Sequence, residues 1–576
     1  MKLILSYLKN YKLLVCLNIL SVFGFALVEL GIPTIMAKII DNGIATQDTA
    51  YIYRMGIVMA IISVVGVLGT ISLGYCSSKI STNVTRDIRN DIFRKVQEFS
   101  HSEYDALGIS SMITRTTNDA FQILQFTNTL LRMALLTPIM FLVSAIMIVK
   151  TSVSLSVVLA ITIPFIILGV VIIAKISGPL SEVQQKRLDK LNRISRENLT
   201  GIRVIRAFGN DTHENERFAD TNEAYTKVSK KLHKLMAISQ PTFFFMLNVA
   251  IIAIFWISSQ MIGVGSLQVG ELVAFIEYLF HAMFSIMLFS MVFIMYPKAR
   301  VSANRIQEIL DTKPIIINPK EGIKETKEQG LVVFDHVTFR YPDGEEAVLR
   351  DISFTAKQGE MVAFIGSTGS GKSTLINLIP RFYDVTEGSI KIDGVDVRDY
   401  DLKALRNKIG FIPQKTRLFT GTIAENIKFG KKDATQEEIK NSTKVAQAYP
   451  FIKGKPKQFE EPISEGGSNM SGGQKQRLSI ARAIVRKPEI YIFDDSFSAL
   501  DFKTDAALRA KLKEETTHSA VLVVAQRIGS ILEADQIIVL NEGEVVGIGK
   551  HEELLRSCDI YQEIALSQLS KEELKL

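Results

Sequence analysis

The sequence is poor in the residues that build metal clusters and disulfide frameworks. Its 576 residues include only 3 cysteines, Cys16, Cys76 and Cys558, which are too few and too scattered for either structure. The 7 histidines are spread along the chain and argue against a metal cluster in the same way. Apolar residues make up 47% of the chain and charged residues 22%, which excludes global disorder and provides core material for more than one domain.

Charged residues are also scarce in six long apolar stretches, all of them before residue 300. Each stretch approaches or exceeds the roughly 20 residues that an α-helix needs to cross about 30 Å of hydrocarbon. The first is too long for the apolar core of a cleavable signal peptide. Six buried helices of a soluble protein are the weaker alternative, because the charges are confined between the stretches. We therefore predict an all-α transmembrane domain with six spans, at residues 13–36, 53–76, 130–149, 153–176, 241–262 and 272–296.

The segments between these spans alternate in length and charge. Two of them, 77–129 and 177–240, are long and charged, and their apolar residues recur at helical spacing. The other three are short and contain almost no cations. The positive-inside rule then predicts a multi-pass protein of the cell membrane whose long segments and both termini are cytoplasmic. The net charge of +7 is thus an orientation signal, and nucleic acid is not expected as a partner.

The composition changes after residue 297. Residues 298–312 have the pattern of a helix that leaves the membrane, and the charged segment 313–329, with proline and glycine, is typical of a linker. From residue 330 onward, short β-branched runs alternate with helical patterns, which indicates an α/β domain. We therefore expect a transmembrane domain with cytoplasmic coupling loops over 1–312, a linker over 313–329 and an α/β domain over 330–576.

A glycine-rich loop follows the apolar strand predicted at 361–365 and precedes a helical pattern. In this strand–loop–helix context it is a P-loop, which makes the α/β domain a nucleotide-binding domain. Its glycines let backbone N–H groups close around phosphates, and the helix start adds a favourable dipole. Lys372 is expected to neutralise the β- and γ-phosphates of ATP, and the Ser373 hydroxyl to ligate Mg²⁺. The loop comprises Gly366, Ser367, Thr368, Gly369, Ser370, Gly371, Lys372, Ser373 and Thr374.

Two further motifs extend the nucleotide chemistry. Asp494 ends the strand predicted at 490–493 and is suited to holding Mg²⁺ as a Walker-B carboxylate, although that pattern alone is weak. Shortly upstream, a Ser-Gly-Gly turn opens a helix, where backbone donors bind anions. Because one P-loop already serves one nucleotide, this second phosphate site implies a nucleotide held by another domain. The turn consists of Ser471, Gly472, Gly473 and Gln474.

With these motifs the chain resembles ABC half-transporters of the exporter type, in which one membrane domain is fused to one P-loop NTPase domain. The resemblance implies that Tyr341 is the A-loop residue that stacks on adenine, and that Gln414 of the Q-loop reaches Mg²⁺ and the membrane domain. It also makes Ser498 and Asp501 part of the D-loop, and residues 471–474 the signature that binds a partner's ATP. Weaker matches in the membrane half lie at 113–115, 118–119 and 197–208.

Two departures from the family pattern affect catalysis. Hydrolysing exporters normally carry glutamate directly after the Walker-B aspartate, as the base that activates water, whereas this chain has Asp495. Its carboxylate is one methylene shorter, and a misplacement of about 1 Å can cost on the order of 100-fold in rate. The switch residue is Gln526, where the family usually has a histidine, and an amide cannot become a cation. A site built from Asp495, Gln526 and Gln414 is therefore expected to be slow.

The signature, by contrast, is nearly intact, with Met470 in place of the usual leucine. In ABC dimers each site combines the Walker motifs of one chain with the signature of its partner. This chain is therefore expected to complete the competent site of a second half-transporter, as in the heterodimeric bacterial ABC exporters, many of which handle multiple drugs. The alternatives are a homodimer that hydrolyses slowly, an exporter-fold importer of a metal chelate, and a regulatory ATP-binding subunit without transport.

Ionisable residues within the spans are candidates for substrate contact, because they are costly in a membrane. Glu29 lies in the first span, and Glu277 and His281, four residues apart, share one face of the sixth. Phe284, Leu288, Met291 and Met295 continue that stripe. The plainer interpretation is helix packing. The functional one is a cavity wall for amphipathic small molecules, since Met and Phe form an adaptable surface. An acidic group favours cations, whereas a histidine also suits a porphyrin or a metal complex.

Overall fold

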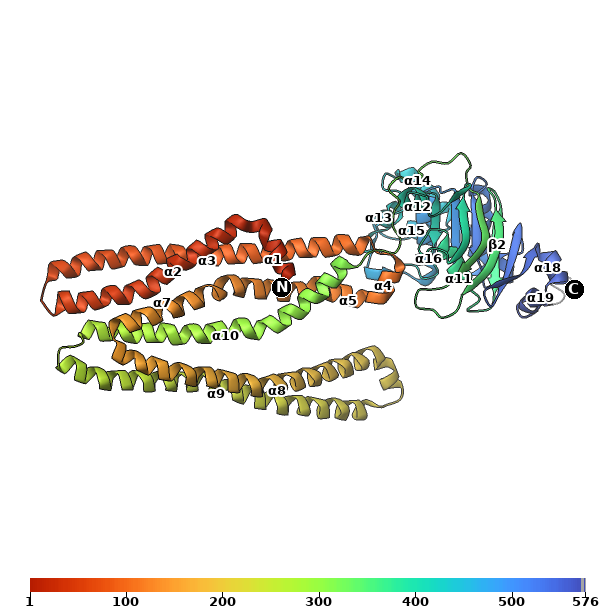
Figure 1. The fold of residues 1–576 in the computed structure, drawn as a ribbon. Helices are drawn as coiled ribbons and strands as arrows, with labels where there is room; N and C mark the ends of the chain where they lie inside the picture. Colours follow the sequence, from red (N-terminus) through yellow and green to blue (C-terminus); the bar gives the residue numbers. More distant parts are fainter. Residues whose placement is uncertain (571–573, 575–576) are drawn as a thin grey trace. The chain divides into compact units, whose positions relative to one another are not determined.

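The structure, a computed structural model, describes residues 1–570 and residue 574. By its internal contacts the chain forms two compact units (Figure 1). The first consists of Met1–Gln97 and Ser110–Thr312, and the second of Glu98–Ile109 and Lys313–Leu576. The short segment Glu98–Ile109 therefore belongs with the second unit, although the sequence places it between two membrane spans.

The first unit is all-α, as predicted. Among the described residues, six helical segments are long and apolar enough to cross a membrane, which confirms the predicted six-span architecture. One of them ends in a π-helical turn at Ile39–Ile44, and another is interrupted by π-helical turns at Arg115–Asp119 and Leu130–Ala134. The α-helices of the unit are α1 (Lys2–Leu8), α2 (Lys12–Lys38), α3 (Thr49–Gln97), α5 (Ile109–Thr114), α6 (Ala120–Thr129), α7 (Leu136–Thr151), α8 (Val153–Ala207), α9 (Asp211–Gly263) and α10 (Val269–Asp311).

Glycines let α2 and α3 approach each other closely. A Cβ atom on Gly66 would lie 1.9 Å from Cγ2 of Val28, and one on Gly69 would lie 3.2 Å from the backbone nitrogen of Phe25. The first distance excludes any side chain unless a helix moves, and the second is already tight. Small residues at such a crossing let two membrane helices gain van der Waals contact along their backbones.

The helices α8 and α9 form a long hairpin and pack chiefly on each other (Figure 1). They contain 55 and 53 residues. At a rise of 1.5 Å per residue, each is about 80 Å long, more than twice the thickness of the hydrocarbon layer. The charged residues of segment 177–240 lie in the half of the hairpin around its connection. The helices predicted for this segment are therefore continuous with the membrane spans.

Two buried charged side chains, Arg115 and Asp119, tie the π-helical turn after α5 to the end of α10. Nη2 of Arg115 lies 2.8 Å from Oε2 of Glu308, and its Nη1 donates to the carbonyl oxygen of Arg305 at 3.0 Å. One turn further, Asp119 accepts a hydrogen bond from the Ser302 hydroxyl at 2.8 Å. Because a buried charge without a partner is costly, these contacts fix the turn against α10.

The second unit is α/β, as predicted. Its larger sheet has the strand order β12-β11-β3-β10-β9-β6, and all neighbours except β12 and β11 pair in parallel. Buried on both faces, the central strands β3, β10 and β9 are continuous apolar runs. The strands of this sheet are β3 (Met361–Gly366), β6 (Ile409–Ile412), β9 (Ile490–Asp494), β10 (Ala520–Val524), β11 (Gln536–Asn541) and β12 (Glu544–Gly549).

A smaller antiparallel sheet and a set of helices complete the second unit. The sheet has the order β2-β1-β4-β5, with β1 (Val332–Phe339), β2 (Leu349–Ala356), β4 (Glu387–Ile392) and β5 (Val395–Asp396). A separate pair joins β7 (Gly421–Thr422) to β8 (Pro462–Ile463). The helices are α4 (His101–Leu107), α11 (Lys372–Leu378), α12 (Leu402–Asn407), α13 (Ile423–Lys428), α14 (Gln436–Val445), α15 (Tyr449–Lys453), α16 (Gly472–Ile484), α17 (Phe502–Glu515), α18 (His551–Ser557) and α19 (Asp559–Leu566).

The carboxyl ends of three neighbouring strands bring the sequence motifs together. The strand β3 leads into the P-loop, β9 ends at Asp494, and β10 leads to Gln526. Val524 of β10 lies opposite Phe364 on one side and Asp494 on the other. Ligands of α/β sheets bind outside the carboxyl ends of the strands, so this edge is the expected place of the nucleotide.

The segment predicted as a linker, 313–329, packs along the second unit. The amide of Asn318 donates to Oδ2 of Asp401 at 3.1 Å and accepts from the backbone nitrogen of Leu402 at 2.8 Å. The backbone nitrogen of Ile323 donates to the carbonyl oxygen of Asp399 at 3.0 Å. These contacts fasten the segment to the start of α12 and the loop before it.

Candidate nucleotide and membrane sites

The P-loop owes its shape to glycines that no other residue could replace. Gly366 ends β3 with φ at 156°, and a Cβ atom there would lie 2.0 Å from the carbonyl oxygen of Leu540 on β11. Gly371, with φ at 95°, is the left-handed residue directly before α11. Ser367, Thr368, Gly369 and Ser370 lie between them. The loop therefore turns tightly enough for its backbone N–H groups to surround an anion at the start of α11.

Lys372 lies inside the loop and has no carboxylate partner at hydrogen-bond distance among the described residues. Its Nζ donates to the carbonyl oxygens of Gly366 at 2.9 Å and Ser367 at 2.7 Å. Burial lowers the pKa of Lys372, while the charges of Asp495 and Asp494 oppose that shift. A phosphate oxygen is a stronger acceptor for an ammonium group than a neutral carbonyl. Lys372 can therefore replace its hydrogen bonds to the loop carbonyls with stronger ones to a phosphate.

Ser373 and Asp494 meet as the sequence predicts. The Ser373 hydroxyl donates to Oδ1 of Asp494 at 2.9 Å. Burial raises the pKa of Asp494, and the hydrogen bond from Ser373 only partly offsets this. The site thus offers a hydroxyl and a carboxylate side by side. Mg²⁺ prefers oxygen ligands of this kind. The residues present therefore fit a magnesium ion.

The aromatic side chain predicted to stack on adenine lies beside the same helix. The Tyr341 hydroxyl and the Thr374 hydroxyl are 3.0 Å apart. The Tyr341 ring meets Phe339 and Tyr383 edge-on, with centroids 4.9 and 5.2 Å away. Edge contacts with these two rings hold Tyr341 in place at the P-loop helix.

Asp495 joins three loops at one carboxylate oxygen. Its Oδ2 accepts a hydrogen bond from Nε2 of Gln414 at 3.1 Å and another from Nε2 of Gln526 at 2.7 Å. The residue is 9% exposed and adopts a left-handed backbone with φ at 46°. The structure thus brings together the residues that the sequence singled out as catalytic. We call this arrangement of Asp495, Gln414 and Gln526 the three-loop clasp.

The signature forms the capped start of α16. Ser471 is the N-cap, whose hydroxyl accepts from the backbone nitrogen of Gln474 at 3.3 Å. A Cβ on Gly472 would meet nothing within 4 Å, whereas one on Gly473 would lie 3.2 Å from the carbonyl oxygen of Ala499. Within residues 1–570 and 574, no hydrogen bond or ion pair connects the signature to the P-loop. The turn at Ser471 and Gly472 is exposed, and backbone N–H groups at a helix start are donors suited to an anion.

The D-loop residues support neighbouring elements. The Ser498 hydroxyl donates to the carbonyl oxygen of Asp495 at 3.0 Å. Asp501 is the N-cap of α17 and accepts from the backbone nitrogen of Thr504 at 2.9 Å, a hydrogen bond that lowers the pKa of Asp501. The D-loop is therefore tied at one end to the backbone of the three-loop clasp.

The sequence alone did not point to Gln568, whose side chain makes two hydrogen bonds to the backbone of the switch loop. Its Nε2 donates to the carbonyl oxygen of Gln526 and its Oε1 accepts from the backbone nitrogen of Ile528, each at 2.8 Å. Gln568 follows α19, which is anchored by the fully buried Tyr561. A glutamine that follows a short helix carries no sequence signal of such a role. Only the fold reveals that it holds the loop from which Gln526 reaches Asp495.

The segment Glu98–Ile109 also binds the nucleotide-binding domain. The ring of His101 stacks on Phe382 with centroids 4.6 Å apart, and burial lowers the pKa of His101. Oε1 of Glu103 accepts from the backbone nitrogen of Ile315 at 3.0 Å. The Tyr383 hydroxyl, whose ring touches Tyr341, lies 3.4 Å from Asp105. The pattern Ser-x-x-Glu at 100–103 predicts the start of α4 but not where it docks.

In the first unit, the structure brings two of the predicted substrate residues together. Oε2 of Glu29 on α2 lies 3.6 Å from Nε2 of His281 on α10. Phe284 stacks on Phe280 with centroids 5.5 Å apart, next to His281. Glu277, one turn earlier on α10, is exposed and has no ion-pair partner in the described part of the chain. Within the predicted stripe, His281 thus pairs with the carboxylate of Glu29, and Phe284 belongs to an aromatic stack beside that pair.

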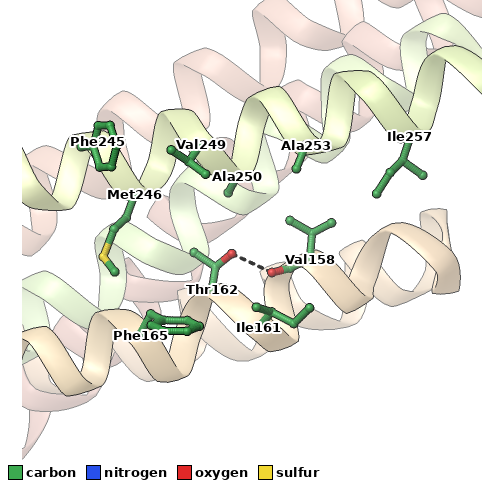
Figure 2. A pocket seen from close by; sticks show the side chains of 10 residues that line it. All are labelled: Val158, Ile161, Thr162, Phe165, Phe245, Met246, Val249, Ala250, Ala253 and Ile257. Carbon is green, nitrogen blue, oxygen red and sulfur yellow. Dashed lines mark hydrogen bonds between the residues drawn. The ribbon is translucent and has the colours of Figure 1, made fainter.

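A separate apolar cavity of about 480 Å³ lies between α8 and α9. Figure 2 shows side chains from both helices turned toward it. The Thr162 hydroxyl donates to the carbonyl oxygen of Val158 on its own helix, at 2.7 Å, so the cavity wall stays apolar. Neither Glu29 nor His281 belongs to it. Its lining residues are Val158, Ile161, Thr162, Phe165, Phe245, Met246, Val249, Ala250, Ala253 and Ile257.

Comparison with known proteins agrees with this geometry. Residues 15–296 match the family described as "ABC transporter transmembrane region", and residues 349–498 match "ABC transporter". An uncharacterized ABC transporter ATP-binding protein of Bacillus subtilis, YfiB, is 37% identical over 99% of this chain and 98% of its own length. A putative multidrug export ATP-binding/permease protein of the same bacterium, YgaD, is 30% identical over 96% and 97%.

The fold has a solved counterpart as well. The structure of a bacterial Atm1-family ABC exporter with ATP bound superposes with a TM-score of 0.79 and covers 98% of both chains, at 23% sequence identity. The six-span unit and the P-loop domain thus both have a counterpart within this one solved chain. The chain belongs to the ABC transporter family, as an exporter-type half-transporter whose ATPase domain is coupled to transport.

Proposed function

We propose that this chain is one half of a heterodimeric ABC exporter of amphipathic small molecules, and that its own Walker site is degenerate. Its signature, Ser471–Gln474, then completes the competent site of a second half-transporter. Both termini and the nucleotide-binding domain lie in the cytoplasm in this proposal, as the cations of segment 177–240 indicate. Export of drug-like compounds is supported by likeness to a putative multidrug export protein.

The three-loop clasp is the observation that carries the proposal. A general base must accept a proton from the attacking water, within about 2.6–3.2 Å of it. Oδ2 of Asp495, a buried residue, already accepts hydrogen bonds from the amides of Gln414 and Gln526. Its side chain is also one methylene shorter than the usual glutamate. Asp495 therefore serves better as an anchor for two loops than as a base.

The remaining residues of the site are intact and suit ATP binding. Lys372 and the P-loop backbone bind the β- and γ-phosphates, and Tyr341 orients the adenine. Ser373 and Asp494, with Gln414, would hold Mg²⁺, which would supply positive charge to offset that of the phosphates. Gln526 can donate an amide hydrogen to the γ-phosphate but adds no positive charge. The site thus retains ATP while lacking the groups that speed its hydrolysis.

The test is the ATPase rate of the purified complex with a partner half-transporter. Gly472→Asp is the first change, because a Cβ there meets nothing in this chain and the new charge repels only a phosphate facing it. We expect it to abolish most turnover. Asp495→Ala, at this chain's own site, should have a far smaller effect, and the chain alone should hydrolyse poorly.

Comparable losses from the two changes would contradict the asymmetry, and a fast rate for the chain alone would favour a homodimer. A repair arm completes the design. Asp495→Glu together with Gln526→His should preserve some turnover when the partner's catalytic glutamate is replaced by glutamine. If no turnover survives, although the partner's signature reads Ser-Gly-Gly-Gln, then Asp495 and Gln526 are not what limits the site.

A further inference from the structure

Two ionisable side chains of different helices meet inside the membrane half. Ionisable residues are costly in hydrocarbon, and they either pair with each other or serve a transported group. Glu29 of α2 and His281 of α10 approach to 3.6 Å, and their side chains are 38% and 14% exposed. The pair is therefore accessible on the carboxylate side, while the imidazole lies deeper in the packing of α10.

Within residues 1–570 and 574, His281 is the one ion-pair partner of Glu29. Segments 57–74 of α3, 136–149 of α7, 153–174 of α8 and 241–263 of α9, whose helices pack against α2 or α10, contain no titratable side chain. The π-helical turns 39–44 and 130–134, which also pack against α10, carry Asp41 and Arg132. On α10 itself lie Glu277, which is also acidic, and Tyr278, whose hydroxyl is 2.6 Å from the Thr34 hydroxyl. The pair itself thus consists of Glu29 and His281, and the exposed Glu277 lies outside it.

Aromatic rings adjoin this negative group. Phe280 and Phe284 stack with their planes 11° apart, and the His281 ring meets Phe280 edge-on at 6.0 Å. Aromatic faces attract cations and also bury apolar surface. A carboxylate beside stacked rings is therefore complementary to a molecule with a positive charge on an apolar body.

We propose that Glu29 binds the positive charge of an amphipathic cation, and that the His281 imidazole occupies this carboxylate when no cation is bound. The inference rests on the proposed export of amphipathic molecules and names their class. Because His281 is turned toward a carboxylate, the pair favours the cationic class among the alternatives that the sequence left open.

The pairing makes binding dependent on pH. Histidine is the side chain that changes charge between about pH 5 and 8. An imidazolium attracts Glu29 and competes with the cation, whereas a neutral imidazole releases the carboxylate. Bound cation and imidazole proton therefore exclude each other, and affinity falls as pH falls. Across the range in which imidazoles protonate, the expected weakening from pH 7.5 to pH 5.5 is roughly tenfold.

Equilibrium binding of tetraphenylphosphonium to the full chain in lipid nanodiscs tests the proposal, because this cation has no proton to lose. Wild type should bind about tenfold more weakly at pH 5.5 than at pH 7.5. Glu29→Gln should weaken binding at pH 7.5 by about tenfold, the loss of an interaction with a charged group. His281→Gln should remove most of the pH dependence while binding persists. Glu277→Gln, an exposed acid on the same helix, is the matched control.

The uncharged analogue triphenylphosphine oxide separates a binding role from a structural one. Glu29→Gln should leave its binding unchanged. An equal loss for both compounds, no saturable binding of the cation to wild type at pH 7.5, or a pH dependence that survives His281→Gln would each overturn the proposal. The assay contains no ATP, so its failure leaves the asymmetric ATPase sites untouched, and the failure of the ATPase test leaves cation binding intact.

Discussion

Asp495→Ala should loosen the Q-loop and the switch loop together, and the structure sets the size of the effect. Each hydrogen bond to an ionised group contributes about 1.5–3 kcal/mol. Asp495 accepts two such bonds and is 9% exposed, whereas Gln414 and Gln526 are exposed, so water replaces part of each bond on the amide side only. Because both bonds end on one oxygen, their sum is less than additive, and we expect a total of about 2–4 kcal/mol. That corresponds to an opening equilibrium raised by about 30-fold to nearly 1000-fold.

The assay is hydrogen exchange of the full chain, read from peptides that contain Gln414 and Gln526. Both loops should lose protection in Asp495→Ala, and Asp495→Asn, which keeps one acceptor oxygen, should lie between it and wild type. Asp343→Ala, at an exposed turn of the same domain, is the control. Loss in only one loop, or loss spread evenly over the domain, would refute the idea that this carboxylate joins the two loops.

Two further predictions concern other contacts. Because burial lowers the pKa of His101 below its ordinary value of 6.5, its stacking on Phe382 requires the neutral ring. Protonation is then linked to undocking, so protection of segment 98–109 should fall as pH drops from 7.5 to 5.5, and His101→Phe should remove that dependence in hydrogen exchange. Gly66→Leu should destabilise the membrane unit by about 1–3 kcal/mol or more, because the new side chain clashes with Val28, and thermal stability in detergent measures the loss. Gly56→Leu is the control, since a Cβ there has nothing within 4 Å, and it should not destabilise the unit.

A pH-independent segment 98–109 would show that His101 is not held by burial of its neutral ring. A Gly66→Leu chain as stable as the Gly56→Leu chain would show that α2 and α3 separate at little cost, contrary to the close approach of their backbones.

Local patterns sufficed for the architecture of this protein. Six apolar runs of membrane-spanning length predicted six spans, and the structure has six such helices among its described residues. The glycine pattern at 366–374 predicted a P-loop between a strand and a helix, and the structure has both. The backbone geometry of such a loop depends on glycines at fixed local spacing, so the sequence is enough to identify it. Ser373 and Asp494, each assigned to Mg²⁺ from its own motif, also meet in the structure, although 121 residues separate them.

Contacts between distant residues were decided by the tertiary structure alone. The sequence marked Asp495, Gln414 and Gln526 as unusual or catalytic, but it could not show that both amides end on one carboxylate oxygen. It gave no sign of Gln568 or of the place where His101 docks. It named Glu29 and His281 from different spans without pairing them. Hydropathy and helical periodicity report on neighbours along the chain, whereas these interactions depend on how separate helices and loops pack.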